Sequence, residues 1–343
     1  MAAMTLSDFD FALPQELIAR FPAERRDGSR LLRLDRRAGA VTHHHFHDLP
    51  GLLAEEDFLV MNNSRVIAAR LLGRVDGRAS EMLVVRDLGA GKLEVLCQPA
   101  ARFKPGAVFV MEEGPRGEVL SAGERGRRVL RFDRIYEKVL EHGYAPLPPY
   151  IKRKAGEASR YRGIDLERYQ TVYAKHPGSI AAPTAGLHFT PEVLERLRRE
   201  HPVLEITLAV GEATFQKIGS EDIDRHRMGS EWIRVDGETG RRIAELKGEG
   251  RALLAVGTTS ARTLESYALL PEPTEEFRSD LFIRPGFRFR LVDKLLTNFH
   301  LPRSSLFILA AAFAGLELLQ EAYREAILEG YRFFSYGDAM LII

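Results

Sequence analysis

The stretch ALLAVGTTSARTLES, residues 252–266, determines the fold class of this 343-residue chain. It begins with five apolar residues that are typical of a buried strand, passes through Gly257, and continues in a pattern that predicts a helix over residues 259–269. Upstream, residues 191–200 predict a helix, 203–210 a strand, 238–247 a helix, and 251–256 the strand that opens the stretch. Helices and strands that alternate in this way indicate an α/β domain.

A different pattern occupies residues 71–132, where Gly-rich turns separate the short apolar runs EMLVVR, KLEVLC, AVFVM and RRVLRF. This spacing predicts a small antiparallel β-barrel. The segment PLPPYIKRK follows, and its three prolines exclude a regular helix or a central strand. We therefore expect a large mixed α/β domain made of residues 1–69 and 151–343, with an inserted small antiparallel β-barrel domain over residues 70–150. Residues 31–35 and 57–61 predict further strands, with a helix-like segment between them.

The composition is that of a packed globular protein, with 45% hydrophobic and 28% charged residues. The single cysteine, Cys97, excludes an intramolecular disulfide and a Cys-rich zinc site. The N-terminus carries acidic residues where a secretory signal has basic and apolar regions. The longest apolar run, residues 306–316, is far shorter than the roughly 20 residues that span a bilayer, and it predicts a buried helix. We expect a cytoplasmic protein with no membrane segment.

The net charge of +1 argues against a protein that coats nucleic acid by charge alone, so RNA binding would need local basic patches. Two segments qualify. Residues 20–37 hold seven arginines against three acidic residues, and residues 151–162 hold five basic residues against Glu157. Solvated surface is the alternative interpretation of both segments.

The run GSIAAPTAGLHFT, residues 178–190, is the first candidate for an active-site loop. Its small residues allow a close approach of backbone to a ligand, while Ser179, Thr184 and His188 offer hydrogen bonds or proton transfer. Thr190 is a plausible helix N-cap, with Pro191 in the first turn. A tight structural turn is the alternative.

Four further segments carry polar candidates. Thr258 and Thr259 follow the strand at 251–256, where a helix N-terminus favours negative groups, although neither GxxxxGK[ST] nor GxGxxG occurs. Asn298 and His300 precede a helix that Ser304 or Ser305 could cap. Capping alone is the alternative for both segments. Polar candidates also follow the strand at 57–61 and lie near the C-terminus: Asn63, Arg65 and Asp338.

The run HHHFH, residues 43–47, suggests a metal site, because a strand would place His43, His45 and His47 on one face. No cysteine or carboxylate grouping in the sequence supports that interpretation. We therefore predict exposed histidines and no metal.

Taken together, the segments resemble the S-adenosylmethionine:tRNA ribosyltransferase-isomerase family of queuosine biosynthesis over nearly the whole chain. The matching stretches, in order, are FDFALPQELIARFP with SRLL, NNSRVIAARL, PPYIKR, RYQTVYAKHPGSIAAPTAGLHFT, VGTTSARTLES, LFIRPGFRFRLVDKLLTNFHLPRSSL and RFFSYGDAMLI. The resemblance implies a large α/β domain interrupted by a small β-barrel. It also implies a transferase that moves the ribosyl moiety of S-adenosylmethionine onto the 7-aminomethyl-7-deazaguanine of a tRNA anticodon loop and isomerises it to give epoxyqueuosine, with adenine and methionine released.

The resemblance further implies that S-adenosylmethionine is consumed as a substrate and that no cofactor is used; we expect a monomer. As a hypothesis, His188 and His300 are the acid–base residues. The remaining candidates would bind substrate: Asn63, Arg65, Tyr173, Ser179, Thr184, Thr258, Thr259, Arg262, Asn298 and Asp338.

Three positions depart from the family pattern, with Ala209 and Gly229 in place of histidines and Ala213 in place of glycine. These departures leave open a divergent paralogue with altered or lost activity that binds tRNA without catalysis. An S-adenosylmethionine-dependent methyltransferase is the other enzymatic alternative, but the Gly-rich loop expected after its first strand is missing from the sequence.

Overall fold

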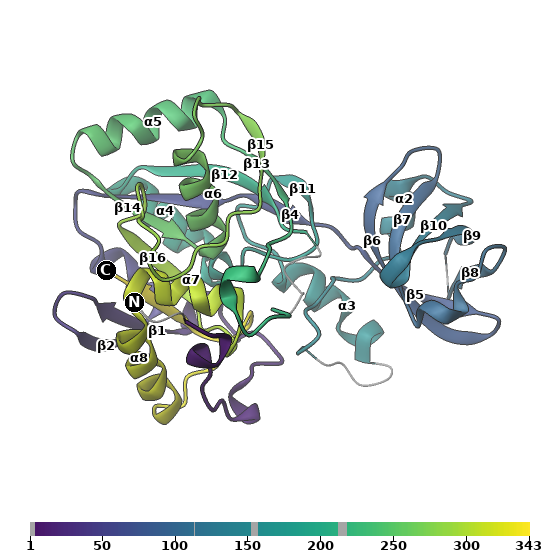
Figure 1. Cartoon of the computed structure of the whole chain (residues 1–343), viewed down its shortest axis with the longest axis horizontal. Coiled ribbons are helices and arrows are strands. Elements are labelled where there is room, and N and C mark those ends of the chain that lie inside the picture. Colours follow the sequence, from purple (N-terminus) through teal and green to yellow (C-terminus); the bar gives the residue numbers. More distant parts are fainter. Residues whose placement is uncertain (1–3, 113, 152–156, 212–217) are drawn as a thin grey trace.

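A computed structural model of the chain describes residues 4–112, 114–151, 157–211 and 218–343. Figure 1 shows its two lobes, a large layered body and a smaller barrel that lies to one side. The body is built on a nine-stranded sheet with the order β15-β13-β12-β3-β14-β16-β17-β1-β2. In that order the strands are β15 (Glu276–Ser279), β13 (Glu231–Arg234), β12 (Val203–Ala209), β3 (Asp57–Asn62), β14 (Ala252–Val256), β16 (Lys294–Asn298), β17 (Ala339–Ile342), β1 (Arg30–Asp35) and β2 (Ala40–His45).

The central strands β12, β3, β14 and β16 run parallel to one another, and antiparallel strands flank them. Strand β3 is buried along its whole length, as expected of a central parallel strand. Its first residue, Asp57, is fully buried, and both carboxylate oxygens accept hydrogen bonds from the Lys294 ammonium at 2.7 and 2.6 Å. This ion pair ties β3 to β16.

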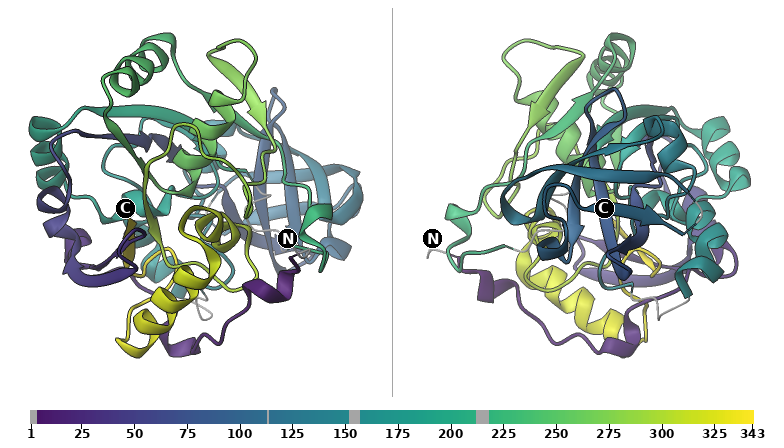
Figure 2. Two further views of the ribbon diagram at one scale, coloured as in Figure 1. Left: turned by 60° about the vertical axis from the view of Figure 1, so that its left-hand side comes forward. Right: turned by 90° about the vertical axis from the view of Figure 1, so that its right-hand side faces the viewer.

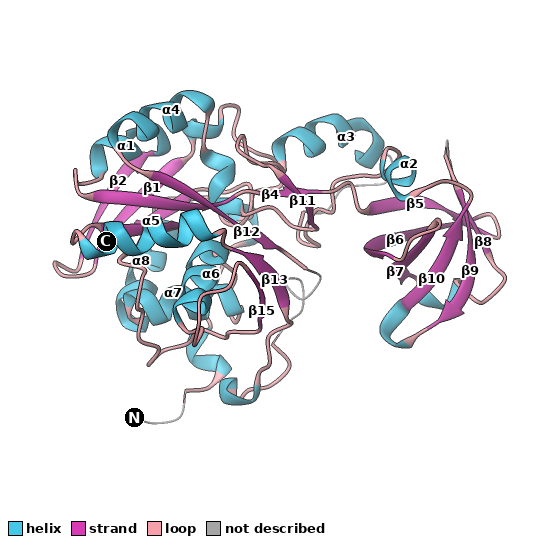
Figure 3. Cartoon of the chain, turned by 90° about the horizontal axis from the view of Figure 1, so that it is seen from above, coloured by secondary structure: helices cyan, strands magenta, loops and turns pink. Residues whose placement is uncertain are grey.

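Helices cover both faces of the sheet (Figure 3). Side chains alternate along β3: Phe58 and Val60 pack into one hydrophobic cluster, whereas Leu59 and Met61 pack into another. The first cluster contains the helices α5 (Gly237–Gly248), α6 (Thr258–Ala268), α7 (Ser305–Ala314) and α8 (Leu316–Leu328). The second contains α1 (Leu49–Leu52) and α4 (Pro191–Glu200).

The N-terminal segment runs along α7 and α8 (Figure 2). Phe11 packs against Phe307 and Tyr323, with ring centroids 5.1 and 5.2 Å away. The backbone N–H of Leu6 donates to the carbonyl of Glu221 at 2.8 Å. The remaining short elements are η1 (Leu6–Phe9), η2 (Gln15–Leu17), η3 (Arg26–Gly28), η4 (Phe46–Asp48), η5 (Ala100–Arg102), η6 (Glu124–Gly126), η7 (Thr184–His188), η9 (Ile223–Arg225), β4 (Ser64–Val66), β11 (His176–Ser179), α2 (Tyr136–Leu140) and α3 (Glu157–Arg168).

The smaller lobe is a closed barrel of antiparallel strands with its own hydrophobic core. Its strands are β5 (Arg70–Val75), β6 (Arg78–Asp87), β7 (Lys92–Gln98), β8 (Val108–Met111), β9 (Arg116–Ala122) and β10 (Arg127–Phe132). The chain enters the barrel after β4 and returns before β11, and these two strands pair with each other. At the crossing Arg70 and Tyr144 exchange backbone hydrogen bonds of 3.2 and 2.8 Å.

The fold class predicted from the sequence is confirmed, and so are the strands and helices predicted between residues 191 and 269. The helix predicted over 306–316 is α7, capped by the Ser304 hydroxyl. A helical segment does lie between the strands predicted at 31–35 and 57–61, in η4 and α1, but strand β2, which pairs with β1 as a hairpin, was not predicted. Its exposed, histidine-rich face hides the apolar alternation by which a strand is recognised.

Among the described residues no single helix is long and apolar enough to cross a membrane, and α7 and α8 reach that length only as a pair bent by 113°.

Candidate active site

A cavity of about 700 Å³ opens at the carboxyl ends of the parallel strands. Loops that follow β12, β14 and β16 form its inner wall, which is where open α/β sheets bind ligands. The linker returning from the barrel and the N-terminal segment complete the rim. The polar and aromatic lining includes Tyr150, Tyr169, Thr184, Glu221, Thr258, Thr259, Arg262, Thr297, Asn298, His300, Arg303, Ser304, Phe334 and Ser335.

Helix α6 points its N-terminus into this cavity. Gly257 precedes it with a φ of +90°, a conformation that glycine adopts without strain, so the chain can turn sharply from β14 into the helix. Thr258 and Thr259 form the first turn, and the free N–H groups there favour a negatively charged ligand. The buried Thr259 hydroxyl has no hydrogen-bond partner within the described part of the chain.

Arg262, one turn further along α6, is buried and forms an ion pair with the buried carboxylate of Glu231 from β13. The second Glu231 oxygen, Oε1, accepts a hydrogen bond from the Gly211 backbone N–H at 3.0 Å. Burial lowers the pKa of Arg262 to about 10, so the guanidinium stays charged at neutral pH. A buried, paired cation therefore lies beside the helix N-terminus.

Asn298, the last residue of β16, is held in one orientation. Its Nδ2 amide donates to His188 Nε2 at 3.0 Å and to the carbonyls of Phe334 and Asp338 at 3.2 and 3.4 Å. Three acceptors around one end of the side chain fix the amide nitrogen there. The buried Oδ1 atom has no hydrogen-bond partner among the described residues, and Asn298 lines the cavity. The Oδ1 atom can therefore accept a hydrogen bond from an N–H or O–H group of a ligand.

His188 lies behind Asn298 and is not among the residues that line this cavity. Because Nε2 accepts from Asn298, the ring proton lies on Nδ1, which donates to the Ser29 hydroxyl at 2.7 Å. The Ser29 hydroxyl in turn donates to the Arg26 carbonyl at 3.2 Å. Burial, reinforced by Arg332 and Arg26, lowers the pKa of His188 to about 3. The ring is therefore neutral at neutral pH, and both of its nitrogen atoms are hydrogen-bonded to protein groups.

His300 lines the cavity directly. Its Nε2 atom shares a hydrogen bond of 2.7 Å with the Thr297 hydroxyl, and its backbone N–H donates to the Tyr323 hydroxyl at 2.9 Å. Burial lowers the pKa of the imidazole to about 3. His300 is thus a neutral base or acceptor at the cavity wall.

Another part of the cavity wall comes from residues that the sequence analysis did not select. The Tyr150 ring packs on the Phe334 ring with centroids 4.1 Å apart, and its hydroxyl bonds the Ser335 hydroxyl at 2.6 Å. Phe334 has a φ of +74°, which is strained for a large side chain. The strained backbone supplies one of the carbonyls that orient Asn298. The PPY sequence at the return from the barrel was the available signal for Tyr150, whereas the Phe334 conformation leaves no signal in the sequence.

The family model described as queuosine biosynthesis protein matches residues 6–342. The chain belongs to this family. The S-adenosylmethionine:tRNA ribosyltransferase-isomerases of Thermotoga maritima and Desulfitobacterium hafniense are each 46% identical to it, over 99% of this chain and all of each relative. A crystal structure of S-adenosylmethionine tRNA ribosyltransferase from Thermotoga maritima is 38% identical, covers 98% of this chain and all of its own, and superposes with a TM-score of 0.56.

Of the candidates selected from the sequence, this member of the queuosine biosynthesis family brings six to the cavity wall: Thr184, Thr258, Thr259, Arg262, Asn298 and His300. Other candidates make internal contacts. The Ser179 hydroxyl donates to Ser64 at 2.8 Å and accepts from the Val210 N–H at 2.9 Å. Asn63 bonds Glu205 and Thr207.

The last three candidates also lie away from the cavity lining. Tyr173 is buried, and its hydroxyl crowds Gly186. The Asp338 carboxylate accepts from the backbone N–H groups of Arg30 and Arg332 at 3.0 and 2.8 Å. Arg65 is exposed on β4.

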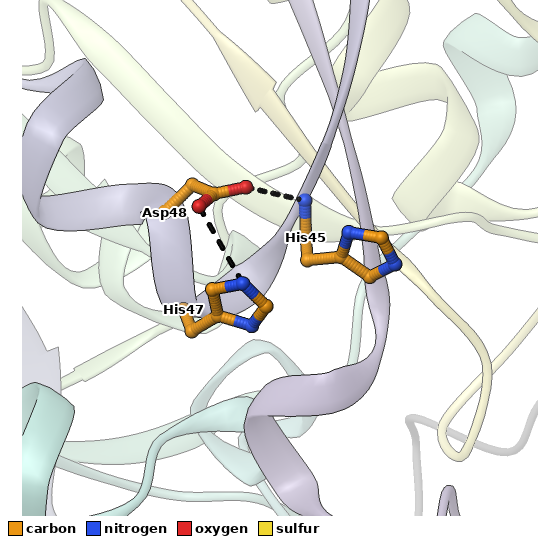
Figure 4. Close-up of side chains that lie close together, drawn as sticks. All are labelled: His45, His47 and Asp48. Atoms are coloured by element: carbon orange, nitrogen blue, oxygen red, sulfur yellow. Dashed lines mark hydrogen bonds and ion pairs between the residues drawn. The ribbon is translucent and has the colours of Figure 1, made fainter.

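The histidine run occupies the β2 hairpin strand and the turn after it. Strand β2 ends at His45, so only His43 and His45 share a strand face. His43 bonds Tyr331 and Glu325. The ligand atoms of His45, His47 and Asp48 lie within 4.8 Å of one another on the exposed surface, and Asp48 accepts from the His45 backbone N–H at 2.9 Å (Figure 4). His43, His45 and His47 are exposed as expected, and His44 is half-buried. Strand β2 lies at the edge of the sheet, away from the strands whose carboxyl ends form the cavity.

Two of the three departures from the family pattern can be located. Ala209 ends β12 opposite Trp232, and the adjacent Val210 lines the cavity. Gly229 follows Met228, which also lines it. Neither Ala209 nor Gly229 is itself part of the lining. Ala213 and the nearby Glu212 lie outside the described residues.

Proposed function

We propose that this chain is an S-adenosylmethionine:tRNA ribosyltransferase-isomerase. It transfers and isomerises the ribosyl moiety of S-adenosylmethionine onto the 7-aminomethyl-7-deazaguanine base of tRNA, which gives epoxyqueuosine-tRNA and releases adenine and methionine. The observation that carries the proposal is the 46% identity to relatives of that name over the full length of both chains. Both S-adenosylmethionine and tRNA are substrates, and no cofactor is required.

The N-terminal turn of α6 fits the methionine end of S-adenosylmethionine. Its free N–H groups favour a carboxylate, and Thr258 and Thr259 add hydroxyl donors. Arg262, one turn further along α6, also lines the cavity, with its guanidinium paired to Glu231. The aromatic part of the wall, formed by Tyr150 and Phe334, fits a planar purine.

The reaction needs a base that removes a proton beside the sulfonium carbon, a proton for the departing adenine, and a neutral aminomethyl nitrogen. His300 is the candidate acid–base residue because it lines the cavity as a neutral imidazole. Asn298 accepts a hydrogen bond from a substrate amino group through Oδ1. The geometry favours a positioning role for His188, whose two ring nitrogens are both occupied by protein partners.

Product analysis tests the proposed reaction. Incubation of the protein with S-adenosylmethionine and tRNA bearing the 7-aminomethyl-7-deazaguanine should release adenine and methionine together with epoxyqueuosine-tRNA. Formation of S-adenosylhomocysteine would instead identify a methyltransferase. Binding of tRNA without any product would identify the divergent, non-catalytic paralogue.

We also propose that the protein acts as a cytoplasmic monomer and that the barrel belongs to an inserted domain bounded by residues 70 and 150. The buried thiol of Cys97 is compatible with a reducing compartment. The backbone pairing of Arg70 with Tyr144 supports the domain limits. Sedimentation of the purified protein at a mass above 38.6 kDa would contradict the monomer.

A further inference from the structure

The first basic segment lies against α3, which begins with the described part of the second, residues 157–162. Arg168, the last residue of α3, donates to the carbonyls of Ala23 and Glu24 at 2.7 and 3.2 Å. In return, Arg26 donates to the carbonyl of Glu167 at 2.9 Å. The loop around residues 20–26 therefore runs along α3, and two segments far apart in the sequence form one surface.

Aromatic rings interleave with arginines at one part of this surface. The Phe21 ring meets the Tyr161 ring edge to face with centroids 5.0 Å apart, and Phe21 is 42% exposed. The Arg160 guanidinium lies 5.4 Å from the centre of the Tyr161 ring, and both Arg160 and Arg20 are exposed. We call these four residues, Arg20, Phe21, Arg160 and Tyr161, the aromatic ledge.

Several other arginines of the segment make contacts within the protein. Arg25 pairs with Asp27, and Arg33 pairs with Asp35. Arg36 donates to three backbone carbonyls, at 3.3, 3.0 and 2.7 Å. The segment is therefore not a uniform cationic surface, and at the ledge its arginines lie beside the exposed Phe21 ring and the half-buried Tyr161 ring.

The ledge adjoins the cavity through one small hydrophobic cluster. That cluster joins Ala19 and Leu166, which flank the ledge, to Tyr150, Tyr169 and Ala182 of the cavity wall. The Ala19 N–H also donates to the carbonyl of Phe333, the residue before Phe334. Figure 1 places α3 between the large body and the barrel.

We propose that the aromatic ledge stacks an unpaired anticodon-loop nucleotide that neighbours the base delivered into the cavity. The proposal rests on the proposed function. A base that enters a buried site leaves its stack, and its neighbours lose their stacking partner. Exposed aromatic rings and arginines replace such stacking in single-stranded RNA recognition, and each stacked base contributes strongly regardless of its identity.

Binding of a fluorescent anticodon stem-loop RNA, measured by anisotropy over a range of salt concentrations, tests this role. Phe21→Leu keeps apolar bulk but removes the ring, so we expect a dissociation constant about tenfold larger and an unchanged salt slope. Phe21→Trp should bind as tightly as wild type or tighter. Arg160→Gln should weaken binding and, where it also meets a phosphate, reduce the salt slope by about 0.7.

Leu328→Ala is the matched control, because Leu328 is 85% exposed at the end of α8 and lies outside the ledge. It should leave RNA binding unchanged. The affinity for S-adenosylmethionine without RNA should be the same in Phe21→Leu as in wild type. Wild-type RNA affinity in both Phe21→Leu and Arg160→Gln, with turnover intact, would overturn the ledge and leave the proposed function standing. Failure of the wild-type protein to bind the stem-loop would overturn both.

Discussion

The Nε2 atom of His188 accepts a hydrogen bond from the Nδ2 amide of Asn298 at 3.0 Å, and Asn298 alone of the two lines the cavity. Together with Ser29, the pair forms a chain of hydrogen bonds that runs from the backbone of Arg26 to the cavity wall. The histidine holds the amide, whose Oδ1 atom has no hydrogen-bond partner among the described residues; we propose that this oxygen accepts a hydrogen bond from the substrate.

Replacing His188 separates a positioning role from proton transfer. Gln can still accept from Asn298, whereas Leu cannot, so we expect His188→Leu to lower kcat/KM by about tenfold and His188→Gln to retain most activity. The loss should appear mainly in KM for S-adenosylmethionine, as measured by adenine release. Equal and severe loss of kcat in both variants would instead show that His188 transfers a proton.

Asn298→Ala removes the acceptor itself. Because a hydrogen bond to a charged ligand group contributes about 1.5–3 kcal/mol, we expect kcat/KM to fall by about 10- to 100-fold. Steady-state kinetics with a circular-dichroism check of folding measure this effect. Near-normal turnover in a folded Asn298→Ala protein would remove Oδ1 from the binding site.

The two buried histidines predict how stability changes with pH. Burial lowers the pKa of both His188 and His300 to about 3, whereas an unfolded histidine titrates near 6.5. Between these values the unfolded chain binds protons that the folded chain does not, so the unfolding free energy falls as the pH falls from 6.5 toward 3. Each histidine contributes a slope of about 1.4 kcal/mol per pH unit.

Urea denaturation of wild type and His300→Gln at several pH values in this window measures that slope. The unfolding free energy of the variant should depend less steeply on pH, by about the slope that one histidine contributes. The carboxylates are common to both proteins, so their contributions cancel in the comparison. Parallel pH profiles would mean that His300 is protonated in the folded protein.

Gly186 has no room for a side chain. A Cβ atom there would lie 2.0 Å from the Tyr173 hydroxyl oxygen and 2.8 Å from Thr171 Cγ2. We expect Gly186→Ala to lower the unfolding free energy by about 2 kcal/mol, as overpacking does elsewhere, and Tyr173→Phe to restore part of it by removing that oxygen. Gly51→Ala is the control, since no atom lies within 4 Å of its added Cβ. Full stability in Gly186→Ala would contradict the packing described around Tyr173.

The ion pair between Asp57 and Lys294 joins two central strands. Lys294→Met would leave the fully buried Asp57 carboxylate without its cation, and we expect a loss of about 3–5 kcal/mol in chemical denaturation. Adding Asp57→Asn to that variant should recover part of the loss. The exposed pair of Arg196 with Glu200 is the comparison, and Arg196→Met there should cost less than about 0.5 kcal/mol.

Much of the sheet was predictable from the sequence because its signals are local. The apolar run of β14, the glycine after it and the amphipathic pattern of α6 lie within one short stretch, and Thr258 follows from the rule that ligands bind at the carboxyl ends of parallel strands. Asn298 was selected as a polar residue just ahead of a capped helix, and the structure places it at the end of β16. Strand β2 was not predicted, because the histidines on its exposed face hide the apolar alternation of a strand.

The rest of the site depends on contacts between distant parts of the chain. Tyr150 reaches the cavity only because the barrel returns the chain there, and Phe334 supplies its carbonyl through a backbone conformation that sequence patterns do not indicate. His188 and Ser179 have the polar character of active-site residues, yet the fold uses that character internally. Polar residue types in the sequence indicated the region of the site. Only the tertiary structure distinguishes the side chains that line the cavity from those that position them.

The crossing between body and barrel has a consequence for evolution and engineering. Arg70 and Tyr144 bring the two ends of the insertion together, and a Cβ on the adjacent Gly143 would lie 1.8 Å from the Ala68 carbonyl oxygen. A module whose ends meet at one backbone pair can be lengthened, shortened or exchanged without displacing the strands that carry Asn298 and the α6 loop. We therefore expect substitutions to be tolerated better inside the barrel than at this crossing, so grafts from relatives should be joined outside residues 68–70 and 143–144.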